Sequence, residues 1–308
     1  MSYKLREDET LGDGMRRVIC GQIEGAIAAG NTPQNGNTSP IHATRKCLKR
    51  ARAALRMIAA EAGRRPARRE NRCLRDVARM ISEIRDAEVR LQTVKQLRDL
   101  FSHRQDRNFL ETEELLAFEL DSFLAAFSDW EEEARTKLSR ARDRVAKWPL
   151  GEVTCETLRR AAQRSYKRGR TALREAVKNP TADEFHNFRK EAKQLWYQLR
   201  VLRPLHPVIF KDLGTELKTI AQHLGHAHDL AFLAARLKSA GRGRKRSARV
   251  LGGLIEAREE ELQRRAAVLA ERFYAQRPRD FGRRISEYFA EWEIAKRRCP
   301  RGTELAAI

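Results

Sequence analysis

Two stretches of the chain repeat one pattern of apolar and polar positions. Residues 41–58 read IHATRKCLKRARAALRMI, and residues 185–202 read FHNFRKEAKQLWYQLRVL. In both stretches apolar side chains recur every three or four residues, which is the spacing of one buried face on an α-helix. The positions predicted to be buried are Ile41, Thr44, Leu48, Ala51, Leu55 and Ile58 in the first stretch, and Phe185, Phe188, Ala192, Leu195, Leu199 and Leu202 in the second. The pattern predicts two amphipathic helices of the same design.

Helical spacing continues over most of the remaining chain, and no stretch alternates convincingly as a β-strand does. Further helices are predicted over residues 8–29, 68–94, 111–147, 154–178, 211–237 and 248–275. Residues 30–39 are rich in turn formers and residues 241–247 are basic, so both are predicted to be loops. Each half of the chain thus supplies four helices, and helices with short connections pack as bundles. The predicted fold class is all-α, with two four-helix bundles.

Local signals mark where the two repeated helices begin. Ser39 is predicted to cap the first helix, with Pro40 in its first position. Ahead of the second helix, Thr181 and Glu184 have the spacing of a capping box. Each helix is therefore expected to begin close to its first matched histidine.

The polar positions of the two stretches match residue for residue. The matched pairs are His42 with His186, Arg45 with Arg189, Lys46 with Lys190, Lys49 with Lys193, and Arg56 with Arg200. At about 100° per residue, these positions fall within roughly 80° of one another on a helix. A basic stripe is most often a solvated face, but ordinary faces mix signs, and no acidic residue occurs between His42 and Met57. The absence of acidic residues from the first stripe, and the repetition of its basic positions in the second stretch, favour a bound anionic ligand.

The charge of the whole chain agrees with an anionic partner. It holds 63 Lys and Arg against 42 Asp and Glu, a formal net charge of +21. Such a field favours nucleic acid, an anionic membrane surface or another polyanion. The 308 residues, 41% of them hydrophobic, leave room for two domains or one duplicated domain.

Cellular location is inferred from the cysteines and the apolar stretches. The five cysteines form no CxxC pair, which indicates reduced thiols rather than a disulfide framework or a zinc knuckle. The N-terminal sequence MSYKLREDETLGDG lacks the apolar core of a secretory signal, and the most apolar stretch, residues 115–127, is too short to span a bilayer. We expect a cytoplasmic protein.

Three other predicted helices add basic faces. Residues 68–94 place Asp86 in phase with several arginines, and residues 211–237 place Asp229 in phase with Lys218 and His226. The arginines on the face of residues 68–94 include Arg72, Arg75 and Arg79. Residues 154–178 place Arg160, Arg164 and Lys167 on one face.

The two H-x-x-R-K-x-x-K segments, with Leu224-Gly225-x-x-x-Asp229 and Ile84-Arg85-Asp86, resemble the CHAD domain, the conserved histidine α-helical domain. The resemblance implies two four-helix bundles related by a pseudo-twofold axis, with the basic helices lining a central groove or pore. It also implies binding of inorganic polyphosphate and association with polyphosphate granules. The expected organisation is one CHAD domain at 5–295, a first bundle at 5–150, a second bundle at 151–298 and a C-terminal tail at 299–308.

The chain departs from the family pattern in two places. The family's second basic helix commonly continues K-R-L-R-Y, whereas this chain has Trp196 where the last arginine would stand, so the second half carries less charge. Many relatives are fused to a triphosphatase domain with an ExExK strand motif. Glu7 and Glu9 show that first spacing without the lysine or a strand pattern, so we expect a stand-alone domain.

The predicted ligand is inorganic polyphosphate or another linear polyanion, held by side chains from several helices. The predicted binding residues are His42, Arg45, Lys46, Lys49, Arg52, Arg56, Arg72, Arg75, Arg79, Arg160, Arg164, Lys167, His186, Arg189, Lys190, Lys193, Tyr197, Arg200, Lys218 and His226. The two matched histidines have an ordinary pKa near 6.5, and cationic surroundings are expected to lower it until an anion binds. Acid is therefore expected to favour binding, unless the histidines only cap or pack the helix starts.

Three alternatives remain open. Nucleic-acid binding follows from charge, although Trp196 and Tyr197 are the only stacking pair on the basic faces. His223, His226 and His228 lie close together, but no carboxylate or thiolate completes a tetrahedral zinc site. No Ser-His-Asp set, P-loop or paired carboxylates support a phosphohydrolase. We expect a binding module, not an enzyme, with no cofactor and no metal.

Overall fold

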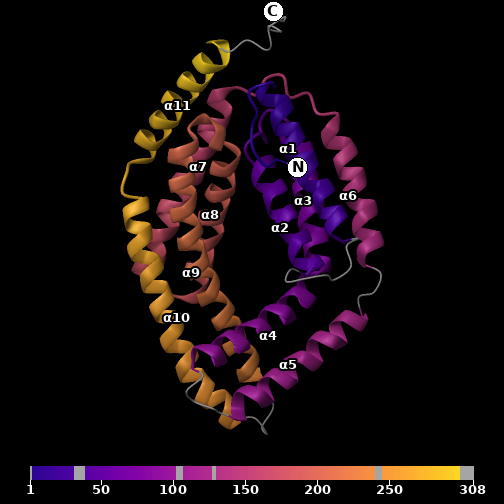
Figure 1. Ribbon diagram of the computed structural model, residues 1–308, viewed down its shortest axis with the longest axis vertical. Helices are drawn as coiled ribbons and strands as arrows, with labels where there is room; N and C mark the ends of the chain where they lie inside the picture. Colours follow the sequence, from indigo (N-terminus) through magenta and orange to yellow (C-terminus); the bar gives the residue numbers. More distant parts are fainter. Residues whose placement is uncertain (1, 31–38, 102–106, 127–129, 240–244, 299–308) are drawn as a thin grey trace, which may run out of the picture.

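The computed structural model describes residues 2–30, 39–101, 107–126, 130–239 and 245–298. All regular structure in these ranges is helical, which confirms the predicted all-α class (Figure 1). The helices are α1 Leu11–Gly30, α2 Pro40–Leu55, α3 Arg64–Met80, α4 Ser82–Leu100, α5 Arg107–Ala126, α6 Trp130–Ala146, α7 Cys155–Lys178, α8 Ala182–Val201, the short 3₁₀ helix η1 Arg203–Leu205, α9 Pro207–Ser239, α10 Lys245–Phe273 and α11 Pro278–Arg298. No described helix has the length and hydropathy to cross a bilayer.

The two repeated stretches form α2 and α8, and their apolar positions are buried as predicted. All twelve side chains predicted to be buried expose less than 8% of their surface. Burying such side chains contributes about 1.5–3 kcal/mol each for the larger aliphatic and aromatic ones. The apolar faces of α2 and α8 therefore fix which way their polar faces point.

The helix starts follow the predicted capping chemistry. The Ser39 hydroxyl accepts a hydrogen bond from the backbone N–H of His42 at 3.2 Å, and Pro40 is the first residue of α2. The Thr181 hydroxyl accepts from the backbone N–H of Glu184 at 3.3 Å. Among the described contacts, the Glu184 side chain makes no bond back to Thr181, so only half of the predicted capping box forms.

Two of the predicted long helices are wrong. Residues 68–94 are divided between α3 and α4, with a break at Ile81, where φ is −105° and ψ is 18°. The Ile81 side chain is fully buried and Ser82 donates to the carbonyl of Arg79 at 2.6 Å, so the turn keeps the apolar spacing that predicted one helix. Residues 111–147 are divided between α5 and α6, separated by residues 127–129, which lie outside the described ranges.

The predicted loops fall mostly outside the description. Residues 31–38 and 241–244 are not among the described residues, whereas Lys245 to Ser247 already belong to α10, contrary to the prediction of a loop there. The predicted tail at 299–308 also lies outside the described residues.

The helices form two groups that meet along α2 and α8. Helices α1, α2, α3 and α6 contact one another, and α7, α8, α9, α10 and α11 form the second group. Helices α4 and α5 pair with each other and pack on α9 and α10, so they extend from the first group to the second at the lower end of the molecule (Figure 1). The predicted twofold relation between two four-helix bundles stays a prediction, because α4 and α5 do not complete a simple set of four.

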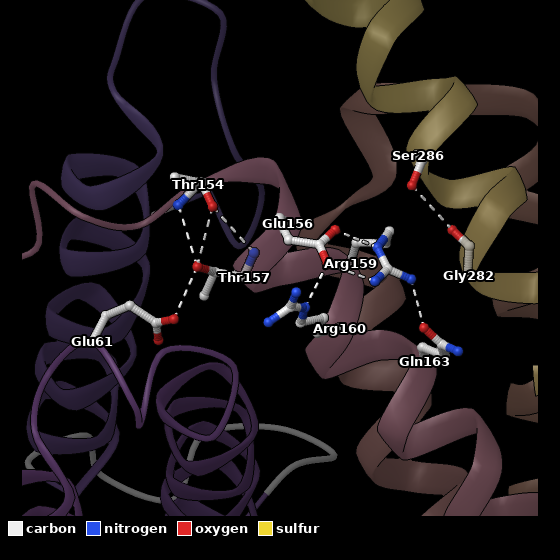
Figure 2. Close-up of polar contacts among 9 residues, drawn as sticks. All are labelled: Glu61, Thr154, Glu156, Thr157, Arg159, Arg160, Gln163, Gly282 and Ser286. Carbon is white, nitrogen blue, oxygen red and sulfur yellow. Dashed lines mark hydrogen bonds and ion pairs between the residues drawn. The ribbon is translucent and has the colours of Figure 1, made fainter. Parts of the chain in front are cut away.

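Polar contacts hold the groups in place at two points. Glu70, which is fully buried on α3, accepts two hydrogen bonds from Arg144 on α6, at 2.8 and 2.7 Å, and one from Arg69 at 2.7 Å. Thr157 on α7 donates to Glu61, in the connection between α2 and α3, at 2.9 Å (Figure 2). Buried carboxylates held by arginine forks give charge-assisted hydrogen bonds with defined geometry.

Candidate anion-binding site

Helices α2 and α8 contact each other through the side chain of one buried glutamine. Gln194 on α8 donates to the carbonyl of Ala53 at 3.2 Å, and it accepts from Arg56 on α2 at 2.9 Å. Because each helix buries its apolar stripe in its own group, this contact brings the two basic stripes to the same region.

The basic side chains that meet there form what we call the central cluster. It consists of His42, Arg45 and Lys49 from α2, Arg85 from α4, His186, Arg189, Lys190 and Lys193 from α8, and His228 from α9, as their mutual electrostatic effects show.

Lys49 and Lys193 both have lowered pKa values. Desolvation, followed by the charges of Lys193, Arg45 and Arg189, lowers the pKa of Lys49 to about 7. Desolvation and the charge of Arg189 lower the pKa of Lys193 to about 8. Solvent still reaches Lys49. This lysine is therefore exposed at the surface and not sealed in the core.

The cluster is poorly neutralised. Among the described residues, Arg85 is its only member with an ion pair inside 4.0 Å, to Glu88 at 2.9 Å. Arg189 has a buried Nε with no hydrogen-bond partner. A buried unpaired donor costs about 1–3 kcal/mol. The cluster thus holds charge and hydrogen-bonding capacity that an anion would satisfy.

Two carboxylates lie near these cations without pairing with them. Burial raises the pKa of Asp86 on α4 and of Asp229 on α9. The largest effect that lowers the pKa again comes from the charge of Arg45 for Asp86 and from the charge of Arg189 for Asp229. Asp86 and Asp229 therefore lie within electrostatic range of Arg45 and Arg189.

Two histidines of the cluster form a pair. The Nδ1 atoms of His186 and His228 lie 3.1 Å apart, and the ring centroids are 4.2 Å apart. One Nδ1 must donate and the other accept, so the pair cannot hold a proton on both atoms without losing this bond. Desolvation and neighbouring cations lower the pKa of His228 to about 4 and also lower that of His186. Desolvation, followed by the charges of Arg85 and Lys46, lowers the pKa of His42 to about 4.

The cluster contains His228 of α9, whereas the predicted binding residue His226 is exposed and lines a pocket with Asp229, Thr93 and Arg258. His228 was predicted only as a possible zinc ligand, together with His223 and His226. Arg85 was also missed as a site residue, although the Ile84-Arg85-Asp86 motif had drawn attention to it.

Other predicted residues flank the cluster. Arg52 donates to Asn71 at 3.0 Å, and desolvation followed by the charges of Arg56, Arg75 and Arg79 lowers its pKa to about 10. Arg75 and Arg79 of α3 therefore lie beside the basic face of α2. Arg72 is exposed on α3, and no described contact joins it to the cluster.

On the opposite flank, cations are packed on aromatic rings. The guanidinium of Arg200 lies 5.5 Å from the ring centroids of both Tyr3 and Trp196. Arg50 lies 5.7 Å from the Tyr3 ring, and Arg200 is among the charges that lower the pKa of Lys46. Tyr197 is buried, so its ring is not a free surface for stacking.

Four predicted residues lie elsewhere. Arg160, Arg164 and Lys167 line a pocket with Arg159, Gln163 and Pro278, and Arg160 is held by Glu156 (Figure 2). Lys218 is exposed on α9, and no described contact joins it to the cluster. The structure thus gathers the residues of α2 and α8 and does not bring those of α7 to them.

The zinc alternative finds no support in the described part of the chain. No set of three or more His, Cys, Asp and Glu side chains there is placed to hold a metal ion. His228, one of the three histidines considered, pairs with His186 instead.

Comparison with known proteins places the chain in a family. The family model of the CHAD domain matches residues 27–238, which is more than half of the 308-residue chain and includes both basic helices, α2 and α8. A search of curated proteins found no match. From the family match, the chain belongs to the CHAD domain family.

Proposed function

We propose that this chain binds inorganic polyphosphate at the central cluster. One observation carries the proposal: two matched basic helices, α2 and α8, bring cations together without neutralising them. The charge of Lys193 contributes to the lowered pKa of Lys49, and an anion bound between the two lysines would offset this repulsion.

The residue types suit phosphate oxygens. An arginine guanidinium offers a planar fork to two oxygens, whereas a lysine acts as a mobile point charge. The cluster contains both types, with Arg45, Arg85 and Arg189 around Lys49 and Lys193. Neutral histidines add N–H donors, and protonated histidines add charge.

The arrangement suits a linear ligand better than a compact one. Arg45, Lys49, Arg52 and Arg56 recur at helical spacing along α2 over about 16 Å, at 1.5 Å per residue. On α8, Arg189, Lys193 and Arg200 occupy the positions that match Arg45, Lys49 and Arg56. A chain of phosphates presents repeating charges that side chains at such spacing can meet in turn, which is also what the CHAD resemblance implies.

The proposed role is that of a binding module in the cytoplasm, at polyphosphate granules, and not of an enzyme. Asp86 and Asp229 come from different helices, and in this proposal they orient Arg45 and Arg189 instead of performing acid–base chemistry. Nucleic acid remains the competing ligand on charge alone. This alternative is weakened because proteins that bind single-stranded nucleic acid expose aromatic rings for base stacking. Here Tyr197 is buried, and the guanidinium of Arg200 lies over the ring of Trp196.

Competition at one fixed, moderate salt concentration tests the identity of the ligand. Labelled long-chain polyphosphate is bound to the protein and then challenged with unlabelled polyphosphate or duplex DNA at equal phosphate concentration. We expect DNA to need at least a tenfold excess to displace half of the label. Displacement by DNA at equal or lower concentration would assign the site to nucleic acid. Salt is held constant because both ligands weaken steeply with it. Phosphate release with Mg²⁺ or Mn²⁺ is measured in parallel, and none is expected.

A further inference from the structure

A second basic pocket lies away from the central cluster, between α7 and the start of α11. Its volume is about 300 Å³, and it is lined by Arg159, Arg160, Gln163, Arg164, Lys167 and Pro278. None of the described interactions within the central cluster involves these residues. The central cluster therefore does not explain the basic lining of this pocket.

Hydrogen bonds join several residues on one side of the pocket (Figure 2). Arg159 donates to both carboxylate oxygens of Glu156, at 2.5 and 2.7 Å, and to Gln163 at 2.5 Å. Helix α11 passes directly against this pair. A Cβ at Gly282 would lie 2.6 Å from the Gln163 Oε1 and 2.7 Å from an Arg159 nitrogen, so these two side-chain ends lie close against the α11 backbone.

The front of the pocket carries cations with unused donors. Arg160 is bound to Glu156 through its Nε alone, and 63% of its side-chain surface is exposed. Arg164 and Lys167 are exposed and form no ion pair or side-chain hydrogen bond among the described residues. Arg160, Arg164 and Lys167 share one face of α7 over about 10 Å, at 1.5 Å per residue.

The charge and the lining define the kind of ligand. Four cationic side chains line the pocket, and the carboxylate of Glu156 is shared by only two of them. The lining contains no aromatic ring on which a base could stack. Arginine forks next to a lysine favour oxygens of a multiply charged phosphate group.

We propose that this pocket is a second anion site, which binds a short segment of condensed phosphate independently of the central cluster. The identity of the ligand rests on the proposed function, whereas the existence of a separate site does not. A long chain that reaches both sites would be held by two attachments. Its affinity would then exceed that of a short chain, because the second attachment is intramolecular.

The test counts tripolyphosphate molecules bound per chain by isothermal titration calorimetry on the full-length protein. We expect two for the wild type and one for the double variant Arg164→Glu with Lys167→Glu. The matched control is Arg174→Glu with Lys178→Glu, which makes the same charge change on exposed positions of α7 outside the pocket, and it should still bind two. Circular dichroism confirms that each variant is folded. Long-chain polyphosphate should bind the pocket variant at least tenfold more weakly than it binds the control.

The outcomes separate this inference from the proposed function. One tripolyphosphate per wild-type chain, or equal behaviour of the pocket variant and its control, would overturn the second site and leave the central cluster untouched. The variant Lys49→Glu with Lys193→Glu should also bind one molecule, now in the pocket. If this variant still binds two molecules, the assignment of the central cluster fails. The pocket is then tested by the Arg164→Glu with Lys167→Glu variant alone.

Discussion

At the scale of single residues, the central cluster is defined by cations that lower one another's proton affinity. Lys49, with a pKa of about 7, is partly neutral near neutral pH, and His42 and His228, each with a pKa of about 4, are neutral there. A bound polyanion reverses these effects by adding negative charge next to each group. Binding and protonation are therefore linked at this site.

Polyphosphate binding should take up protons at pH 7. The anion raises each lowered pKa, so the bound protein holds more protons than the free protein, and the affinity rises as the pH falls from 8 to 6. Calorimetry in two buffers with different ionisation enthalpies counts the protons. Lys49→Arg keeps the charge without titrating near neutrality and should reduce the uptake at pH 7–8. His186→Gln with His228→Gln should remove part of it below pH 7.

Controls come from the same chain. His206 lies outside the cluster, so His206→Gln should leave the proton count unchanged. If the wild type binds polyphosphate tightly but takes up no protons, the linkage between binding and protonation is contradicted. The identity of the ligand is not affected by that result.

Sequence reasoning found the residues of this site only where the information was local. His42 with Lys49, and His186 with Lys193, were found because each pair lies on one helix and the spacing occurs twice. Arg85 and His228 were missed because they come from α4 and α9, and only the packing of those helices brings them to the cluster. The sequence periodicity of one helix carries no information about such contacts.

At the scale of elements, the positions of α2 and α8 were predictable and the breaks in longer helices were not. Their buried faces and the Ser39 and Thr181 caps were confirmed. The division at Ile81 was not foreseen, since a buried isoleucine in phase with its neighbours gives no sequence signal for a turn. This break separates α4 from α3, and α4 then presents Arg85 to the cluster.

Close packing at the start of α1 gives a stability prediction. A Cβ at Gly12 would lie 2.1 Å from the carbonyl oxygen of Leu150, and a backbone atom cannot rotate away. Gly12→Ala should therefore destabilise the protein by about 1–3 kcal/mol, as overpacked sites do. Gly214, inside α9, has no atom within 4 Å of such a Cβ. Gly214→Ala should stabilise the helix by about 0.5–1 kcal/mol.

Urea unfolding followed by circular dichroism measures both changes. The two substitutions are chemically identical and should move the midpoint in opposite directions. An unchanged or raised midpoint for Gly12→Ala would show that α1 and the Leu150 segment are not packed as described.

At the scale of the whole molecule, net charge and architecture have separate consequences. The formal charge of +21 attracts any polyanion, whatever the fold. Packing decides where the charge is concentrated, because α2 and α8 meet through Gln194 while α7 turns its basic face toward α11. The all-α class and the family were confirmed, whereas the twofold relation between bundles stays a prediction.

The most direct test of the central cluster is the affinity for long-chain polyphosphate after charge reversal of Lys49 and Lys193 together. The matched control, Arg135→Glu with Lys137→Glu, makes the same charge change on exposed residues of α6, far along the chain from both basic helices. We predict that Lys49→Glu with Lys193→Glu weakens binding at least a hundredfold, while the control weakens it less than threefold. Equal affinities of the two variants would contradict the assignment, because net charge alone would then explain the binding.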